Sequence, residues 1–549
     1  MSFLGKDDIL VLEKNNGTVN RIINGQMLDE PLLKVDVDFT QERGLLGSAV
    51  KNNSNGTTNV FLYFTELKNN ENVNHTDSFE KSILGNRVFQ YDFVNGELIN
   101  PRLLYEIPFN REPPYHIGGK MVIGPDKNLY IAVGDLLAKN AITQNFRNGT
   151  AIDGSGGIIR IDLEGGTEES IFEYPGLDKY YAYGIRNSFG MDFDPVTGKL
   201  WNTENGPGYG DEINLVEPGF NSGWKKVQGL WKPVDEFAGD LFTNVTDLTD
   251  FDQVNSYQYP KLTWAGTIGI TALKFLNSSN FGEGYFGDIF VGDFNKGDIY
   301  HFELNENRST ILDDSSMISE VEIDGANHSV IYQDPFSNCF NFFECIVTQS
   351  TSITDNSKEN QSLSLSTTLS KNFTWSWVYG REYGVTEGNN YTISTTFGQN
   401  ENGVSSHISL QGFNKNSQLW EEILQCPSGI SGFLRVSTFQ CDFVVPNNVS
   451  KIQPIINAGW STGDNKTATT VFHQLQIHNK ENGESADLLP KVDPLFPVIG
   501  RGFGHITDIQ QGPDGNLYVL TINPQGGVDF DHSRGNQGLD GVIYKISKK

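Results

Sequence analysis

The stretch "GPDKNLYIAVGD" (residues 124–135) joins a tight turn to a short strand and ends on a carboxylate. Its centre, "NLYIAV", is β-branched and aromatic, which favours a strand, and "GPDK" is typical of a turn. Related strand-and-turn units recur at 7–22, 58–67, 194–206, 286–302 and 512–523. Six copies of one short unit indicate a repetitive all-β architecture.

The spacing of these units indicates which repetitive all-β architecture they form. The first five begin about 50 to 90 residues apart, which suits four strands and long loops in each blade of a propeller. The final "DGVIYKISKK" (540–549) would complete a blade begun at the N-terminal end. We therefore expect a six-bladed β-propeller, with residues 1–333 forming blades 1–5 and 487–549 the last blade and closure. A single irregular array of β-sandwiches is the alternative.

The last gap exceeds 220 residues, so it contains an insertion, which we place at 334–486. Segments such as "QSLSLSTTL" and "NYTISTTF" alternate strictly, as strands with one buried face do. We predict an inserted jelly-roll-like β-sandwich of the carbohydrate-binding kind. Its tryptophans would either stack on sugar rings or fill the core, and they are Trp375, Trp377, Trp420 and Trp460.

The charge balance limits the partners. Forty basic and 68 acidic residues give a net charge of −28, which argues against nucleic acid or an anionic membrane. No apolar run approaches the roughly 18 residues that cross a bilayer. The chain also starts directly on a strand pattern instead of a signal peptide.

Four cysteines lie close together in the insertion, and none has C-x-x-C metal spacing. We predict two disulfides, most simply Cys339–Cys345 and Cys426–Cys441, and other pairings or a reduced set remain open. Fourteen N-x-S/T sequons, among them Asn16, agree with export. The expectation is a secreted, extracellular or cell-surface glycoprotein whose leader has been removed.

Two polar residues frame the opening unit. His116 lies in the glycine-rich "YHIGGK" (115–120), where an imidazole could act as a general base. Asp135 follows the next strand and could orient that imidazole. The plainer interpretation is two loop residues beside a sheet. Arg186, in "YAYGIRNSFG" (181–190), could stabilise an oxygen that gains negative charge, or it could be an arginine in a surface turn.

An oxygen-rich turn follows in "NTENGPGYGDEINL" (202–215). Its "NGPG" centre presents main-chain carbonyls, and Asp211 and Glu212 add carboxylates, a set that suits Ca²⁺. Most Gly-Pro turns bind nothing, so the pattern alone is weak.

Taken in order, "ERGLLGSAV", "HIGGKMVIGPDKNLYIAVGD", "AYGIRN…TENGP…GDEINL" and "GPDGNLYVLT" resemble the soluble quinoprotein glucose/sorbosone (aldose sugar) dehydrogenase family. The resemblance covers everything outside the insertion, and the third block is the specific one. It implies a six-bladed propeller that binds pyrroloquinoline quinone (PQQ) and Ca²⁺ and oxidises the C1 hydroxyl of aldoses to lactones.

The resemblance also implies roles for individual residues. His116 would be the base, Asp135 its orienting partner, and Arg186 would lie near the reacting oxygens, with Asn187 beside the cofactor. The carbonyls of Gly206 and Pro207 would bind the cofactor's Ca²⁺. Asp211 would be a pocket acid, Glu212 a ligand of a second Ca²⁺, and Trp264 an aromatic lining of the pocket.

Three features of the sequence depart from the family pattern. Where the family carries an Arg-x-Arg pair on the cofactor carboxylates, "GHITDIQQGPDG" (504–515) has His505 and Thr507. Losing two bidentate donors weakens the grip on an anion. A fifth-blade lysine is displaced by one place to Lys296, and Asn205 replaces the residue usual before Gly-Pro.

These observations favour a secreted quinoprotein sugar dehydrogenase that acts on aldose sugars or glycans and passes electrons to an unknown acceptor. The alternative is a non-enzymatic Ca²⁺-binding propeller that serves as a glycan- or protein-binding module and no longer binds PQQ. A third hypothesis is a lactonase-type hydrolase, which would need several carboxylates that converge on the metal.

Overall fold

The computed structural model describes residues 1–549 except for a set of segments whose placement it leaves open. These are 69–82, 109–113, 138–139, 165–168, 234–238, 242–246, 252–256, 296, 313–317, 324–325, 332–337, 341–344, 354–358, 370–374, 400–405, 418, 426–435, 459–465, 489–497, 501–502, 504, 523–540 and 548–549.

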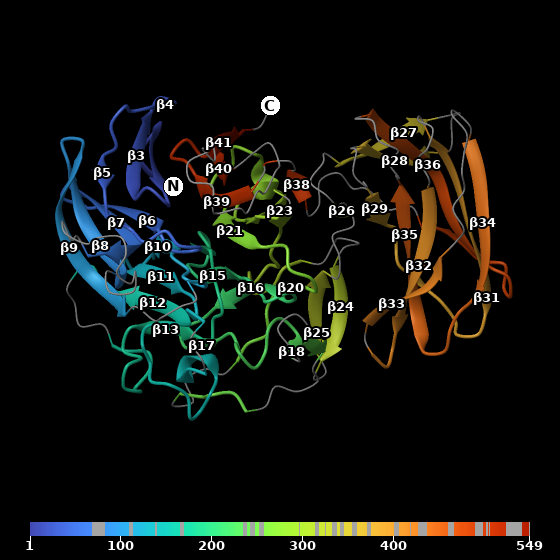
Figure 1. The fold of residues 1–549 in the computed structure, drawn as a ribbon, viewed down its shortest axis with the longest axis horizontal. Coiled ribbons are helices and arrows are strands. Elements are labelled where there is room, and N and C mark those ends of the chain that lie inside the picture. Colours follow the sequence, from blue (N-terminus) through green and yellow to red (C-terminus); the bar gives the residue numbers. More distant parts are fainter. Residues whose placement is uncertain are drawn as a thin grey trace, which may run out of the picture.

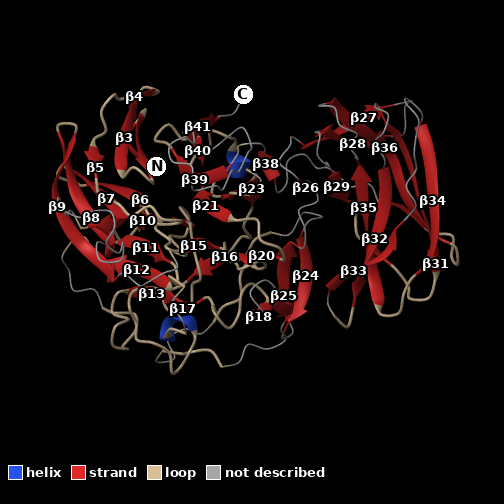
Figure 2. Cartoon of the chain, in the orientation of Figure 1, coloured by secondary structure: helices blue, strands red, loops and turns tan. Residues whose placement is uncertain are grey.

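The described residues form an all-β protein, as expected from the sequence (Figure 2). Their helical content is two short 3₁₀ turns, η2 (Ile142–Gln144) and η3 (Glu283–Tyr285). Within the same residues, no helix has the length and apolar character needed to cross a membrane.

Six sheets account for most of the strands outside the region from 338 to 487. The first contains β1 (Ser2–Gly5), β2 (Asp8–Glu13), β3 (Thr18–Ile23), β4 (Gln26–Met27) and β5 (Leu33–Lys34). The second contains β6 (Leu45–Asn52), β7 (Thr58–Leu67), β8 (Ile83–Val94) and β9 (Glu97–Pro108). The third contains β10 (Met121–Ile123), β11 (Leu129–Val133), β12 (Gly157–Ile161), β13 (Tyr180–Tyr183) and β17 (Phe220–Asn221).

The remaining three sheets of this group follow in the same chain order. The fourth contains β14 (Gly190–Phe193), β15 (Leu200–Glu204), β16 (Asp211–Val216), β20 (Leu262–Trp264), β25 (Ala326–Ile331) and β24 (Ile318–Ile323). The fifth contains β21 (Ile270–Phe275), β22 (Ile289–Asp293), β23 (Ile299–Phe302) and β38 (Val498–Gly500). The sixth contains β39 (His505–Gln511), β40 (Leu517–Ile522) and β41 (Gly541–Ile546), and β18 (Trp231–Pro233) with β19 (Gly239–Leu241) form a separate hairpin.

The first strands of these sheets lie next to one another. β1 packs on β6, β6 on β10, β10 on β14, β14 on β21, and β21 on β39. Strands β6, β10, β21 and β39 are labelled in Figure 1. The circuit returns to its start where Phe3 of β1 meets Tyr518 of β40, with ring centroids 5.0 Å apart. The six sheets are therefore arranged in a closed circuit.

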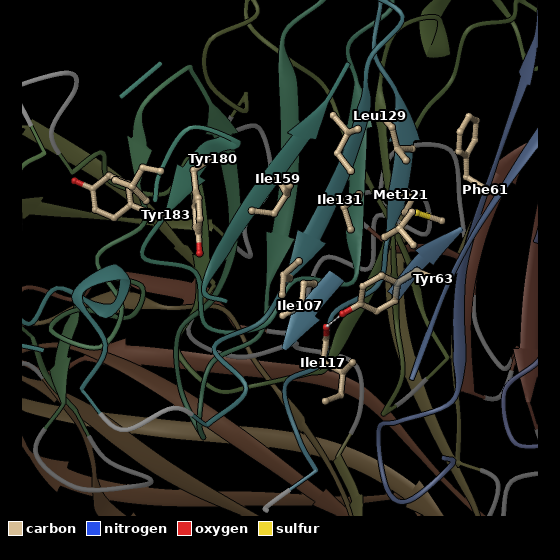
Figure 3. Packing of buried hydrophobic residues seen from close by; sticks show 14 of the residues in the cluster. Phe61, Tyr63, Ile107, Ile117, Met121, Leu129, Ile131, Ile159, Tyr180 and Tyr183 are labelled. Carbon is tan, nitrogen blue, oxygen red and sulfur yellow. Dashed lines mark hydrogen bonds between the residues drawn. The ribbon is translucent and has the colours of Figure 1, made fainter. Parts of the chain in front are cut away.

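The strand of the opening motif shows why this arrangement is stable. All five residues of β11 are buried. Leu129 and Ile131, labelled in Figure 3, pack with Val133 into one hydrophobic cluster, while Tyr130 and Ala132 pack into the next one. Successive side chains of a strand point to opposite faces, so both faces of this sheet are covered by neighbouring sheets. Each large apolar side chain buried in this way contributes roughly 1.5–3 kcal/mol.

The "GPDKNLY" turn is held by its own polar residues. Asp126 accepts hydrogen bonds from the backbone N–H of Asn128 (3.1 Å), from its amide nitrogen (3.0 Å) and from the Tyr130 hydroxyl (2.7 Å). The later copy, "GPDGNLY", repeats these contacts with Asp514, Asn516 and Tyr518. In both copies, the side chains of the motif therefore stabilise the turn.

Strands between 338 and 487 pair with one another in two further antiparallel sheets. One contains β26 (Asn338–Phe340), β29 (Trp375–Tyr379), β30 (Tyr383–Gly384), β32 (Ser406–Asn414), β33 (Leu419–Gln425) and β35 (Val449–Ala458). The other contains β27 (Cys345–Ile353), β28 (Glu359–Leu369), β31 (Asn390–Gln399), β34 (Val436–Val444), β36 (Lys466–Asn479) and β37 (Ser485–Asp487). Ile408 and Ile452 of the first sheet share a buried cluster with Ile393 and Leu475 of the second.

Some predictions for the inserted region concern side chains that the structure does not describe. Cys441 is disulfide-bonded, but Cys426 is not described, so the pairing of Cys426 with Cys441 stays a prediction, as does that of Cys339 with Cys345. Trp420 is half-buried, with its ring centroid 5.5 Å from that of Phe413. The side chains of the other three tryptophans predicted to meet sugars, Trp375, Trp377 and Trp460, lie outside the description.

Candidate active site

Residues of the candidate site lie before, or at the start of, the first strands of neighbouring sheets. His116 lies before β10, Arg186 before β14, and the loop at 265–269 before β21, while His505 begins β39. Since these first strands stand side by side in the circuit, their leading loops meet at one end of it. The hydrogen bonds described below run from loop to loop around that end.

His116 and Asp135 form a buried pair, and their predicted roles as base and orienting partner stay predictions. The Nδ1 atom of His116 lies 2.6 Å from Oδ1 of Asp135, and the two residues are 8% and 2% exposed. Oδ2 of Asp135 accepts a hydrogen bond from the Trp224 indole at 2.7 Å, and Oδ1 also accepts the backbone N–H of Leu137 at 2.9 Å. The carboxylate therefore fixes the proton on Nδ1, and Nε2, which meets no hydrogen-bond partner among the described residues, is left as an acceptor.

The hairpin geometry explains why this pair forms. β10 and β11 run antiparallel, so the residue before the first and the residue after the second come together. His116 has a left-handed backbone (φ 60°), which turns its side chain out of the strand direction. A Cβ on Gly134 would clash with the carbonyl of His116, so only glycine permits this close approach.

Glu42 is a site residue that the sequence reasoning did not identify. Its Oε2 accepts the backbone N–H of His116 at 2.8 Å, the N–H of Ile117 at 3.3 Å and the amide of Asn187 at 3.3 Å. One carboxylate thus ties the loops before β10 and β14 to the loop before β6. Two of its partners are backbone amides, which leave no mark in a sequence, and no pattern within "ERGLLGSAV" could have revealed them.

Arg186 is built into the site and does not lie free in a surface turn. Its Nη1 donates to the carbonyl of Asn205 at 2.8 Å, and its guanidinium lies 5.3 Å from the centre of the Trp224 ring. Burial lowers the pKa of Arg186, and the carboxylates of Asp135, Asp211, Glu42 and Glu204 oppose that shift. Its Nε is buried without a partner among the described residues. Arginine remains a cation in such surroundings.

Asp211 connects two loops of the site. Its Oδ1 accepts the backbone N–H of Gly206 at 2.8 Å, and its Oδ2 accepts those of Ile268 (2.8 Å) and Gly269 (2.9 Å). The side chain is fully buried, and burial raises the pKa of Asp211 to about 6 against the three N–H donors. The carboxylate braces the loops, and its predicted role as a pocket acid stays a prediction.

The turn held by Asp211 presents free carbonyl oxygens. Gly206 and Pro207 are partly exposed, and their carbonyls accept no hydrogen bond from the residues that the structure describes. Asn205 beside them is anchored through its amide to the carbonyl of Ile270 at 2.9 Å. Two adjacent free carbonyls are suitable ligands for a hard cation.

Behind this turn lie two buried glutamates, Glu204 and Glu212, which face each other on β15 and β16. Glu212 accepts hydrogen bonds from Asn214 at 2.9 Å and Gln228 at 3.0 Å, and from the backbone N–H of Gly229. Among the described residues, no group of three or more His, Cys, Asp or Glu side chains is arranged to hold a metal. The second Ca²⁺ predicted at Glu212 therefore stays a prediction.

The other predicted cofactor residues are placed as follows. Asn187 is 3% exposed, and its Oδ1 finds no partner in the described part of the chain. Trp264 packs in a hydrophobic cluster, with its ring centroid 5.6 Å from that of Tyr300. Thr507 donates to the carbonyl of Leu520 at 3.2 Å, and Lys296 lies outside the described residues. Whether any of the four meets a cofactor stays a prediction.

A separate hollow of about 580 Å³ lies where the strands of several sheets turn back. Pro125, Asp194 and Gln511, from the turns of three sheets, are part of its lining. Its charged residues are paired, Asp192 with Lys274 at 2.9 Å and Asp194 with Arg308 at 2.7 Å. This hollow therefore offers little free charge, and it does not include the His116–Asp135 pair.

Fold and site together define an all-β protein with a buried His–Asp pair beside an arginine. The chain belongs to the glucose/sorbosone dehydrogenase family, which matches residues 1–325. The resemblance inferred from the motifs is thereby confirmed.

Individual relatives cover different parts of the chain. It is 30% identical over 207 residues to quinoprotein glucose dehydrogenase B of Acinetobacter calcoaceticus, covering 35% of this chain and 42% of that one. It is 26% identical over 207 residues to aldose sugar dehydrogenase YliI of Escherichia coli, covering 36% and 49%. An uncharacterized protein of Synechocystis is 28% identical over 338 residues, covering 58% and 75%. The chain thus spans less than half of the two named enzymes. A putative glucose dehydrogenase structure from Thermus thermophilus aligns with a TM-score of 0.48 at 16% identity, covering 99% and 94%.

Proposed function

We propose that this protein is a PQQ- and Ca²⁺-dependent sugar dehydrogenase that oxidises the C1 hydroxyl of an aldose to the lactone. The observation that carries the proposal is the His116–Asp135 pair, with its 2.6 Å contact and an Nε2 that meets no partner among the described residues. Membership of the glucose/sorbosone dehydrogenase family supports it, as does the similarity to a quinoprotein glucose dehydrogenase.

In this proposal His116 is the general base. Asp135 holds the proton on Nδ1, so Nε2 accepts the proton of the sugar hydroxyl, and the resulting imidazolium is stabilised by the same carboxylate. Arg186 places a fixed positive charge near the oxygen that loses its proton. A positioned base of this kind contributes about 10²–10⁴-fold to a rate.

The residues present are chemically suited to the two cofactors. Gly206 and Pro207 offer free carbonyls for Ca²⁺. In the described part of the chain, Nε of Arg186 and Oδ1 of Asn187 have no hydrogen-bond partner, so they suit an acceptor and a donor on PQQ, respectively. When bound, the quinone supplies the acceptor for the hydride that leaves C1.

The architecture is part of the same proposal. We take the six sheets of the circuit as the six blades of a propeller and residues 334–486 as an inserted jelly-roll-like domain that holds glycans. We also place the protein outside the cell. The disulfide at Cys441 supports this location, because disulfides persist in oxidising compartments.

One observation favours a different function. Glu42, Asp135, Glu204 and Asp211 all surround Arg186, so the site is rich in negative charge. Such a site would disfavour an anionic cofactor, and the protein would then be a Ca²⁺-binding module without redox chemistry. A hydrolase has less support, because these carboxylates are already engaged by N–H donors.

Calorimetric titration of the metal-depleted protein with PQQ in the presence of Ca²⁺, paired with a dye-reduction assay on aldoses, tests the proposal. We expect saturable binding and dye reduction that His116→Ala abolishes. His301→Gln is the matched control, because it breaks a different buried His–Asp pair, His301–Asp288, with Nε2 and Oδ2 at 2.8 Å. Absence of PQQ binding would exclude the dehydrogenase and favour the binding module.

A further inference from the structure

His505 has one ring nitrogen satisfied and the other left over. Its Nδ1 lies 2.5 Å from the carbonyl oxygen of Phe294, and its ring stacks on that of Phe294 with centroids 4.5 Å apart. The residue is 8% exposed, and its Nε2 is buried with no hydrogen-bond partner among the described residues. A buried polar atom without a partner destabilises the folded state, so a missing partner needs an explanation.

A continuous set of hydrogen bonds joins His505 to the candidate active site. Asp211, which holds the turn at Gly206, also holds the backbone of Gly269 at 2.9 Å. The carbonyl of Gly269 accepts the N–H of Phe294 at 2.8 Å, and the carbonyl of Phe294 in turn meets His505. His505 therefore belongs to the same end of the circuit as Gly206, Asp211 and Arg186.

The contact with Phe294 determines which ring nitrogen carries a proton, and therefore which kind of group Nε2 can bind in the neutral and in the protonated ring. A carbonyl only accepts, so Nδ1 carries a proton in every state of this contact. In the neutral ring, Nε2 offers only a lone pair. In the protonated ring, Nε2 becomes a charged donor while the bond to Phe294 is kept. The ring can thus change its charge without changing its position.

Among the charged groups that the structure describes around His505, the imidazole is the one that can supply positive charge at Nε2. On the elements packed against it, Asp293 ends β22, Asp508 lies on β39 paired with Lys120 at 2.7 Å, and Asp211 braces residues 268 and 269. Lys296 and Arg501 lie outside the described residues. No ion pair among the described residues brings a cation to His505. Of the described residues, the ring itself is therefore the group that can give a counter-charge to an anion at Nε2.

We propose that His505 binds a carboxylate of the anionic quinone as an imidazolium, so that cofactor binding takes up one proton at Nε2. This inference rests on the proposed function, and it deepens it by making cofactor loading dependent on pH. Imidazole changes charge between about pH 5 and 8, so the affinity weakens as the pH rises. With one proton taken up, Kd rises about tenfold per pH unit above the point at which the free ring loses its proton.

The test is calorimetric titration of the Ca²⁺-loaded protein with PQQ at about pH 7.5, in two buffers of different ionisation enthalpy. The difference in heat gives the number of protons bound. We expect close to one proton for the wild type and for the control His301→Gln. We expect none for His505→Gln or for His505→Arg, and the arginine variant should bind PQQ with an affinity that no longer depends on pH.

The outcomes separate the two proposals. Binding without proton uptake in the wild type, or unchanged uptake in both His505 variants, overturns the inference and leaves the dehydrogenase standing. Absence of PQQ binding at about pH 6 as well as at about pH 8 overturns the dehydrogenase and this inference with it. Because His505→Arg retains a planar cation, it serves where circular dichroism shows that His505→Gln has not folded.

Discussion

Glu204 and Glu212 lie opposite each other on neighbouring strands, with the hydroxyl of Ser222 between them. The oxygen of Ser222 is 2.6 Å from Oε2 of Glu204 and 3.3 Å from Oε2 of Glu212. Burial raises the pKa of Glu204 to about 7. Burial and the neighbouring charge of Glu204 raise the pKa of Glu212 well above its usual value. The pair therefore retains a proton where isolated carboxyl groups would have lost it.

This pair predicts that the metal-free protein loses stability as the pH rises. Between the unfolded pKa of a glutamate, about 4.3, and the folded value for Glu204, about 7, the native state binds more protons than the unfolded state. The free energy of unfolding then falls across that window, by on the order of 3 kcal/mol. Glu204→Gln should flatten the slope and raise stability at about pH 8. Urea unfolding in EDTA at a series of pH values measures it, and an unchanged slope in the variant would contradict the assignment.

Asp135→Asn tests the tautomer of the proposed base. An asparagine amide can donate to Nδ1, which would move the ring proton to Nε2 and remove its capacity to accept. We expect kcat for aldose oxidation to fall about 10²–10⁴-fold with little change in KM. Trp224→Phe removes one donor to the same carboxylate and should cost far less (about tenfold). Equal losses in the two variants would point to packing as the cause.

The His–Asp pair was within reach of sequence reasoning because its geometry is local. The two residues flank a single antiparallel hairpin, β10–β11, and the hairpin brings them together. The strand pattern of "LYIAV" (residues 129–133) was equally readable, since burial on both faces leaves no charged or amide side chain in it. These features follow from the 2-residue period of a strand and from turn chemistry.

Contacts between distant loops were out of reach. Glu42 meets His116 across 74 residues of sequence, and its partner there is a backbone amide. Ser222 joins Glu204 across 18 residues through a hydroxyl that no motif marks. The braces of Asp211 likewise depend on how the sheets sit around the circuit, which a single sequence does not encode in any local pattern.

Two substitutions of Glu42 separate the effect of losing its charge from the effect of losing its hydrogen-bond acceptor. Glu42→Ala leaves the N–H groups of His116 and Ile117 without their partner, so we expect a loss of about 1–3 kcal/mol in stability and a fall in kcat of about tenfold or more. Glu42→Gln keeps an acceptor oxygen and should stay close to the wild type. Thermal unfolding and dye-reduction kinetics on both variants measure it. A glutamine variant as damaged as the alanine variant would show that the charge itself is required.

The turn motif occurs twice, and we expect removal of its tyrosine hydroxyl to lower stability by different amounts at the two copies. The Tyr130 hydroxyl is buried against Asp126 at 2.7 Å, and burial together with this bond raises the pKa of Tyr130. Tyr130→Phe removes a hydrogen bond to a charged group and should cost about 1.5–3 kcal/mol. At the second copy Asp514 keeps Lys545 at 2.6 Å, so Tyr518→Phe should cost less. Tyr174→Phe, with a ring 38% exposed, is the control. Guanidinium unfolding measures the free energy of unfolding of the three variants. A Tyr130→Phe protein as stable as the control would mean that the turn forms without the tyrosine hydroxyl.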